Sequence, residues 1–280
     1  MPKVHVNGID INYLVQGEGY PLVLAHGYTA SLEMWENQME AFSRKYRVVA
    51  YDSRGHGESE TPADMAQYSM DHYLEDQRAL MEHLGIEEAY MGGLSMGGMI
   101  AMRFALWQPQ MVRALLLCDT AAGLTGPISE EWERTRADAE TRVRTDGVAA
   151  VMARLYQARA QAGHGPTGRP PPAVQRHVER LARMSPDGFL GAGKALREQG
   201  SVLDRLDEIK APTLILVGDK DLLLTPSRAM RQRIPGCHFV LIKDSYHGTC
   251  LWQPEAFTTA VLDFLTKVDA GEPVAGEREL

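Results

Sequence analysis

The sequence predicts an α/β protein with a doubly wound, mostly parallel sheet of about eight strands. Short segments that are apolar throughout recur along the chain, and segments with a helical pattern lie between them. Strands without polar alternation are typical of a parallel sheet that helices cover on both faces. A third observation is that residues 124–200 contain helical patterns and no convincing strand. This stretch is therefore predicted to be a helical cap, inserted after the sixth strand.

The strands begin with a hairpin at Asn7-Gly8, a dipeptide typical of tight turns. The eight predicted strands are Val4–Val6, Ile9–Val15, Pro21–Ala25, Tyr46–Tyr51, Ala89–Met91, Val112–Cys118, Thr213–Val217 and Phe239–Ile242. The helices predicted to cover the sheet are Met34–Ser43, Met70–Leu84, Gly98–Gln108, Arg228–Arg233 and Glu255–Lys267. Residues 1–123 and 201–268 are thus the two parts of an α/β core, and the Gly/Glu-rich residues 269–280 are predicted to be a disordered tail.

Charge distinguishes the predicted cap from the rest of the chain. Its predicted helices are Glu130–Asp146, Val148–Gln161, Ala173–Met184 and Phe189–Gln199, with a Gly/Pro-rich loop at Gly163–Pro172. The cap has eleven Arg and one Lys against nine acidic residues, whereas the whole chain carries a net charge of −8. A basic cap could attract anionic substrates, but solvated helix faces are the interpretation we favour.

Composition excludes several classes of function. The acidic net charge of −8 argues against a nucleic-acid partner, since phosphate contacts need a basic surface. No apolar run approaches 18 residues and the N-terminus lacks the apolar core of a signal peptide, so we expect no membrane partner and a cytoplasmic location. The oligomeric state is left open, a homo-oligomer included.

No cofactor or metal motif is present. The chain has three cysteines, an odd number, at spacings that match no metal site. We therefore expect Cys118, Cys237 and Cys250 to be free, buried thiols. The chain also lacks the Gly-x-Gly-x-x-Gly pattern of dinucleotide-binding proteins. We therefore expect chemistry that needs neither a cofactor nor a metal.

The segment Gly93-Leu94-Ser95-Met96-Gly97 lies between a predicted strand and a predicted helix. This context favours a nucleophile elbow, with Ser95 at the apex of a strained turn, over an ordinary Gly-rich turn. The neighbours of the serine must be small because the turn brings the strand and the helix together. Gly93, Gly97 and Gly98 meet that need.

A serine nucleophile also needs a base and an acid, which in this arrangement follow it in the order acid, then His. His247 comes after the last predicted strand, so it is the expected base at the sheet edge where Ser95 emerges. Asp221 follows the preceding strand and is the expected acid. Asp219 and Asp119 are its competitors, since both also follow strands.

The oxyanion donors are expected to be the backbone N–H groups of Met96 and Tyr28. Met96 comes directly after the serine, and Tyr28 lies after the strand Pro21–Ala25, where Gly27 allows a close approach. His26 is expected to form structural hydrogen bonds. The Gly-rich loop Asp52–Ser59 lacks the Gly-Lys-Ser/Thr ending of a phosphate-binding loop and is interpreted as a structural turn.

Together these motifs resemble the α/β-hydrolase family along nearly the whole chain. The matching segments are His26-Gly27, Asp52–Ser59, Gly93–Gly98, Gly218-Asp219-Lys220-Asp221 and His247. The resemblance implies Ser95 as nucleophile, Asp221 as acid and His247 as base, with Tyr28 and Met96 as oxyanion donors. Gly92–Met99, Leu117–Ala122 and Met184–Phe189 also resemble the 3-oxoadipate enol-lactonase branch and its carboxylesterase relatives.

The leading hypothesis is a serine hydrolase that cleaves a small-molecule carboxylic ester or lactone through an acyl-enzyme. Two alternative reactions would use the same serine, histidine and aspartate: hydrolysis of a carbon–carbon bond and cofactor-free perhydrolysis. A ligand receptor on the same fold is the alternative from another class, and very slow turnover would distinguish it. Dehalogenase and epoxide hydrolase chemistry is disfavoured, since those reactions use a carboxylate where this chain has Ser95.

Overall fold

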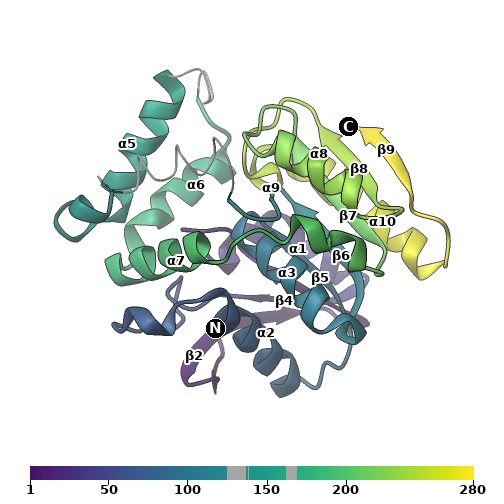
Figure 1. Ribbon diagram of the computed structural model, residues 1–280, viewed down its shortest axis with the longest axis horizontal. Coiled ribbons are helices and arrows are strands. Elements are labelled where there is room, and N and C mark those ends of the chain that lie inside the picture. Colours follow the sequence, from purple (N-terminus) through teal and green to yellow (C-terminus); the bar gives the residue numbers. More distant parts are fainter. Residues whose placement is uncertain (125–136, 138, 162–168) are drawn as a thin grey trace.

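A nine-stranded sheet forms the centre of the computed structural model, which describes residues 1–124, 137, 139–161 and 169–280 (Figure 1). The strand order is β1-β2-β4-β3-β5-β6-β7-β8-β9. β2 runs antiparallel to β1 and β4, and all other neighbours are parallel, which confirms the predicted sheet. The strands are β1 (Lys3–Val6), β2 (Ile9–Gln16), β3 (Tyr20–Ala25), β4 (Tyr46–Tyr51), β5 (Ala89–Leu94), β6 (Val112–Cys118), β7 (Thr213–Gly218), β8 (His238–Ile242) and β9 (Gly276–Glu279).

Helices cover both faces of the sheet. One face packs against α1 (Glu36–Ser43), α9 (Thr249–Trp252) and α10 (Pro254–Asp269), and the other against α2 (Met70–His83), α3 (Met96–Trp107) and α8 (Leu224–Arg233). Leu22 and Leu24 of β3 belong to the first core, while Val23 and Ala25 belong to the second. Successive side chains thus enter opposite cores, which explains why the strands are apolar throughout. Short 3₁₀ helices span Leu32–Trp35, Met65–Gln67, Pro109–Met111, Leu181–Arg183 and Leu203–Glu208.

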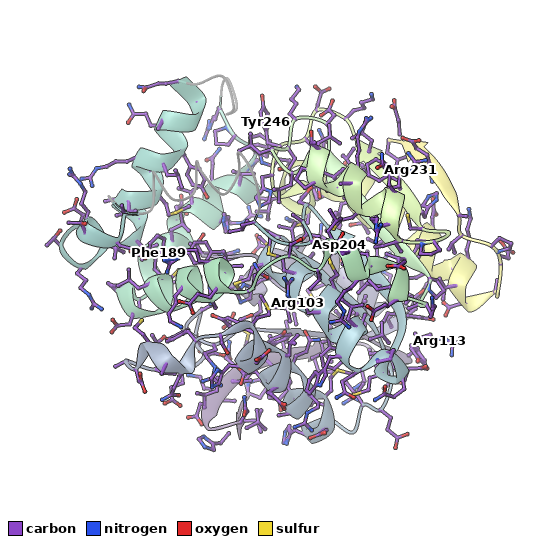
Figure 2. All side chains as sticks on the ribbon, in the orientation of Figure 1. Arg103, Arg113, Phe189, Asp204, Arg231 and Tyr246 are labelled. Atoms are coloured by element: carbon purple, nitrogen blue, oxygen red, sulfur yellow. The ribbon has the colours of Figure 1, made fainter. Side chains whose placement is uncertain are left out.

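The chain between β6 and β7 forms helices and, in its described part, no strand. We call α5 (Val148–Gln161), α6 (Pro172–Arg180) and α7 (Pro186–Glu198) the inserted helices; they lie on the left in Figure 1. α5, α7 and the 3₁₀ helix Leu181–Arg183, which follows α6, share a small apolar core that includes Met152, Leu181 and Phe189, the last labelled in Figure 2. Of the predicted helix 130–146, Ala137 and residues 139–146 are helical, and the remainder lies outside the described residues, as does most of the loop 163–172.

The expectation of a disordered tail is wrong. Residues 276–279 form β9, which pairs in parallel with β8 at the edge of the sheet. Without this pairing β8 would expose its backbone N–H and C=O groups along an open edge. Charged side chains hold the tail in place, since Arg278 pairs with Asp263 at 2.8 Å and Glu277 with Arg231 at 2.6 Å. Gly/Glu-rich composition alone does not reveal such a partner.

Cys118, Cys237 and Cys250 are free and buried, as predicted. In the part of the chain that the structure describes, no helix has both the length and the apolar character needed to cross a membrane.

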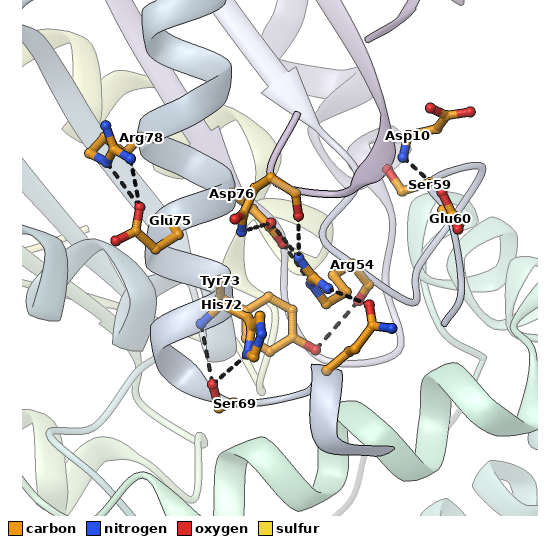
Figure 3. A network of polar contacts seen from close by, with 12 residues as sticks. Asp10, Arg54, Ser59, Glu60, Ser69, His72, Tyr73, Glu75, Asp76 and Arg78 are labelled. Carbon is orange, nitrogen blue, oxygen red and sulfur yellow. Dashed lines mark hydrogen bonds and ion pairs between the residues drawn. The ribbon is translucent and has the colours of Figure 1, made fainter. Parts of the chain in front are cut away.

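A buried ion pair fixes the loop that follows β4. Arg54 reaches Asp76 on α2 through Nε at 2.9 Å and Nη2 at 2.7 Å, and both side chains are only 1% exposed (Figure 3). Asn7 donates a further hydrogen bond to Asp76 at 2.7 Å. Two parallel hydrogen bonds between a guanidinium and a carboxylate fix geometry as well as charge, so this pair sets the position of the loop.

Replacing Asp76 by Asn should lower the free energy of unfolding by about 3–5 kcal/mol, because Arg54 would stay buried without a counter-charge. Urea denaturation measures this change. The matched control is Glu208→Gln, which removes the exposed partner of Arg205 and should change the free energy of unfolding far less. Equal losses in the two variants would contradict the role given to the buried pair.

Candidate active site

Ser95 sits at the apex of a sharp turn between β5 and α3, with backbone angles φ 56° and ψ −114°. A positive φ is strained for a residue with a Cβ, so the surroundings must hold it. The Ser95 N–H donates to the carbonyl of Cys118 at 2.9 Å, and the Thr120 hydroxyl donates to the Ser95 carbonyl at 2.7 Å. The turn is therefore fixed by the chain that leaves β6.

The glycines around Ser95 are required by close backbone contacts. A Cβ on Gly93 would lie 2.2 Å from the carbonyl carbon of Gly97, and a Cβ on Gly97 would lie 2.1 Å from the carbonyl oxygen of Ala25. A Cβ on Gly98 would lie 2.7 Å from Thr120. These separations are far shorter than any real contact, so strand and helix can meet only where side chains are absent.

The loop after β3 lies beside Ser95 and carries Tyr28. A Cβ on Gly27 would lie 3.6 Å from the Cβ of Ser95. The Nε2 atom of His26 accepts from the Ser53 N–H at 2.9 Å, so Nδ1 carries the proton and donates to the Gly27 carbonyl at 2.7 Å. Burial lowers the pKa of His26 to about 4, which keeps the ring neutral. His26 thus forms the structural hydrogen bonds that the sequence predicted.

Asp221 and His247 are in direct contact. The Nδ1 atom of His247 lies 3.1 Å and 3.0 Å from the two carboxylate oxygens of Asp221. The Asp221 side chain is fully buried, whereas that of His247 is 42% exposed. Burial raises the pKa of Asp221, but the charge and hydrogen bond of His247 outweigh it and lower this pKa. A buried, ionised acid beside an exposed imidazole is suited to orienting the ring and stabilising its protonated form.

The other two acid candidates support the histidine loop instead. The Asp119 carboxylate accepts from the N–H groups of Gly248 (3.0 Å) and Thr249 (2.6 Å), from the Thr249 hydroxyl (2.8 Å) and from the Gly218 N–H (3.2 Å). Asp219 accepts from the N–H of Ser245 at 3.2 Å. Neither carboxylate has a hydrogen bond to His247 among those found between described residues. Of the three candidate carboxylates, Asp221 is therefore the one in contact with the imidazole.

Residues 118–120 connect the two halves of the site. Cys118 and Thr120 hold the turn of Ser95, and Asp119 holds the loops around Asp221 and His247. β6 lies between β5 and β7, and β8 follows next in the sheet. Ser95, Asp221 and His247 therefore all lie at the carboxyl edge of neighbouring parallel strands, where α/β proteins place ligands.

The inserted helices contribute residues that the sequence did not single out. The Tyr28 hydroxyl donates to the carbonyl of Phe189 on α7 at 2.7 Å. α6 packs against α9, directly after His247, and it carries His177. Burial, with smaller contributions from Arg180 and His247, lowers the pKa of His177 to about 4. No motif marks His177 in the sequence, because only the packing of α6 on the core brings it near the site.

The loop Asp52–Ser59 supports the neighbouring elements, as predicted. Asp52 is buried and accepts from the Asn12 side chain at 2.7 Å, from the Leu32 N–H at 2.7 Å and from the Glu58 N–H at 2.9 Å. The Asp52 carboxylate thus connects β2, the segment after the Tyr28 loop and the turn that contains Glu58. Its hydrogen bonds are internal, which fits a structural turn better than a phosphate-binding loop.

The neutral state of His26 predicts a pH dependence of stability. Between about pH 6.5 and pH 4 the unfolded chain binds a proton at this position and the folded chain does not, so stability falls as the pH falls through this window. Through this window His26 changes the free energy of unfolding by at most about 1.4 kcal/mol per pH unit. Chemical denaturation at several pH values from 4 to 7 measures the free energy of unfolding. This free energy should rise less steeply with pH in His26→Gln than in the unsubstituted protein. Identical slopes would mean that His26 is protonated in the folded state.

Comparisons with known proteins give relatives over most of the chain. The chain is 29% identical to 3-oxoadipate enol-lactonase 2 of Acinetobacter baylyi over 256 residues, which cover 90% of this chain and 92% of the relative. The enol-lactonase of Burkholderia xenovorans LB400 has a similar structure, with a TM-score of 0.81, 27% identity and coverage of 95% and 100%. A thermophilic esterase from Thermogutta terrifontis has a TM-score of 0.84, 29% identity and coverage of 96% and 99%.

A family model described as the alpha/beta hydrolase fold matches residues 20–254. This range includes the Ser95 turn, the loop of Tyr28 and the Asp221–His247 pair. The resemblance inferred from the sequence is confirmed, both for the family and for its similarity to the enol-lactonase branch. The chain belongs to the α/β-hydrolase fold family.

Proposed function

We propose that the protein is a serine hydrolase that cleaves carboxylic esters or lactones, with Ser95 as nucleophile, His247 as base and Asp221 as acid. The observation that carries this proposal is the contact of His247 Nδ1 with the buried Asp221 carboxylate, at the sheet edge where Ser95 emerges. With Nδ1 oriented by the carboxylate, Nε2 is the ring nitrogen that would take the proton of the Ser95 hydroxyl. The names of the enol-lactonase and esterase relatives support the choice of an ester or lactone carbonyl.

In the proposed reaction the Ser95 oxygen attacks the substrate carbonyl while His247 takes its proton. The negative oxygen that forms is stabilised by the N–H groups of Met96, at the start of α3, and of Tyr28. His247 then gives the proton to the leaving alkoxide, and an acyl group stays on Ser95. Water, activated by the same imidazole, releases the acid product. In a lactone the leaving alkoxide belongs to the same molecule as the acyl group.

Several expectations about the protein stay predictions. They include the cytoplasmic location, the role of the inserted helices as a substrate-selecting cap and the absence of a cofactor. Carbon–carbon hydrolysis and perhydrolysis would use the same residues, so substrate profiling separates them from ester cleavage. A receptor would bind its ligand with very slow turnover, and the kinetic experiments that follow distinguish it from an enzyme.

Replacing Ser95 by Ala should lower kcat for p-nitrophenyl acetate by about 10⁴-fold or more, because the nucleophile is lost while the binding groups stay. The assay should extend along an ester series from acetate to palmitate and to a lactone. Ser201→Ala, at an exposed serine outside the site, is the matched control and should keep full activity. Retained turnover in the Ser95 variant, without an initial burst of product in the unsubstituted protein, would refute the acyl-enzyme.

Asp221→Asn should lower kcat by about 10⁴-fold, because an amide cannot hold the required imidazole tautomer or stabilise its charge. The isosteric change Asp219→Asn is the control for the competing acid. It alters only the hydrogen bond to the Ser245 N–H and should reduce kcat far less. If Asp219→Asn lowered kcat for the same ester more than Asp221→Asn, Asp219 would be the acid.

A further inference from the structure

The inserted helices meet the core at two places that are held in different ways. α7 packs beside the 3₁₀ helix Met65–Gln67, and α6 packs against α9, which directly follows His247 (Figure 1). α5 packs against the 3₁₀ helix Leu181–Arg183 and has no comparable contact with a core element among the described residues. The attachments of α6 and α7 therefore decide which part of the insertion can move relative to the core.

The attachment of α7 is a close contact between backbones. A Cβ on Gly188 would lie 1.9 Å from the carbonyl oxygen of Gly55, and a Cβ on Gly191 would lie 2.4 Å from the ring of Tyr68. The backbone of α7 thus lies directly on the core. A charged side chain, Lys194, adds a hydrogen bond to the Tyr68 carbonyl at 3.2 Å. Close packing of this kind depends little on the salt concentration, because most of it involves no net charge.

The attachment of α6 consists largely of ion pairs. Arg176 Nε lies 2.7 Å from Glu36 Oε1, and Arg180 Nη2 lies 2.5 Å from Glu36 Oε2. Arg180 also donates to the Glu33 carbonyl at 3.1 Å, and Arg183, just after α6, pairs with the Glu33 carboxylate. Glu36 begins α1, and Glu33 lies on the short 3₁₀ helix before it. We call these three arginines and two glutamates the ion-pair cluster.

The ion-pair cluster supplies much of the attachment of α6, because Ala173 is the only buried residue of this helix. Burial raises the pKa of Glu36, but hydrogen bonds and charges of Arg180 and Arg176 outweigh it and lower this pKa. The side chains of Arg180 and Glu36 are still 21% and 30% exposed, so solvent reaches the cluster. Salt screens ion pairs that are in contact with solvent. The attachment of α6 should therefore weaken as the salt concentration rises, and that of α7 should not.

We propose that α6 is a gate that the ion-pair cluster holds closed beside the loop of His247, while α7 stays fixed on the core. Opening the gate breaks the ion pairs to Glu33 and Glu36 and moves α6 away from α9. The position of α6 against α9 makes this the side of the insertion at which opening uncovers the histidine loop. The motion itself does not depend on catalysis, whereas its use for admitting an ester or lactone rests on the proposed function.

Hydrogen–deuterium exchange, followed by mass spectrometry of peptides from α6 and α7, tests the gate. Raising the NaCl concentration from about 0.1 M to about 1 M shortens the Debye length from about 10 Å to about 3 Å. The amides of α6 should then exchange about fivefold faster, whereas those of α7 should keep their rates. The double variant Glu33→Gln/Glu36→Gln should show this faster exchange of α6 already at the lower salt concentration, with no further effect of salt.

Glu75→Gln is the matched control, because it removes the partner of Arg78 from a surface ion pair on α2 and should leave the exchange of α6 unchanged. Ser95→Ala should exchange as the unsubstituted protein does, which separates the gate from the proposed catalysis. Exchange of α6 that does not respond to salt would overturn the proposal, as would an equal acceleration of α7. The salt series needs no substitution, so it decides the question even if the double variant does not fold.

The role of the gate in substrate entry has its own measurement. In the double variant, kcat/KM for p-nitrophenyl octanoate should rise relative to kcat/KM for the acetate, because the longer ester needs the wider opening. An unchanged ratio, with α6 exchanging faster, would overturn the role in entry and leave the motion. If no ester were hydrolysed at all, the exchange rates would still test the gate, and the proposed function would fail separately.

Discussion

The site depends on the close approach of three backbones beneath Ser95. β5, the start of α3 and the end of β3 meet where Gly93 and Gly97 leave no room for a side chain. This contact forces the serine into its strained conformation and directs it out of the sheet edge. It also brings the loop of Gly27 and Tyr28 against the serine, where a backbone N–H can serve an oxyanion. One steric constraint thus positions both the proposed nucleophile and the backbone N–H groups proposed to stabilise the oxyanion.

Asp119 positions the loops that carry the proposed acid, Asp221, and the proposed base, His247. Its four hydrogen bonds hold Gly218 and the residues after His247, while its neighbours in sequence hold Ser95. Burial and the charge of Asp221 raise the pKa of Asp119 above its usual range. Two buried carboxyl groups close together are costly, and the N–H and hydroxyl donors around Asp119 reduce that cost. The arrangement leaves Asp221 charged next to the imidazole.

Much of the core was predictable because its signals are local. Apolar strands, the Asn7-Gly8 turn and the glycines around Ser95 each reflect contacts within a few residues or a fixed strand–helix connection. The choice of Asp221 over Asp119 was an expectation from chain order, and its contact with His247 agrees with it. β9 could not be predicted, because its strand depends on the free edge of β8. The proximity of α6 to the site likewise depends on tertiary packing alone.

The central claim is that Ser95 carries an acyl group during turnover. Mass spectrometry of the intact protein, quenched by acid during hydrolysis of a slowly deacylated ester, tests this most directly. A fraction of the protein should be heavier by the mass of one acyl group, and peptide analysis should map this group to the segment that contains Ser95. No adduct under conditions where product forms in a burst, or an adduct on another residue, would contradict it.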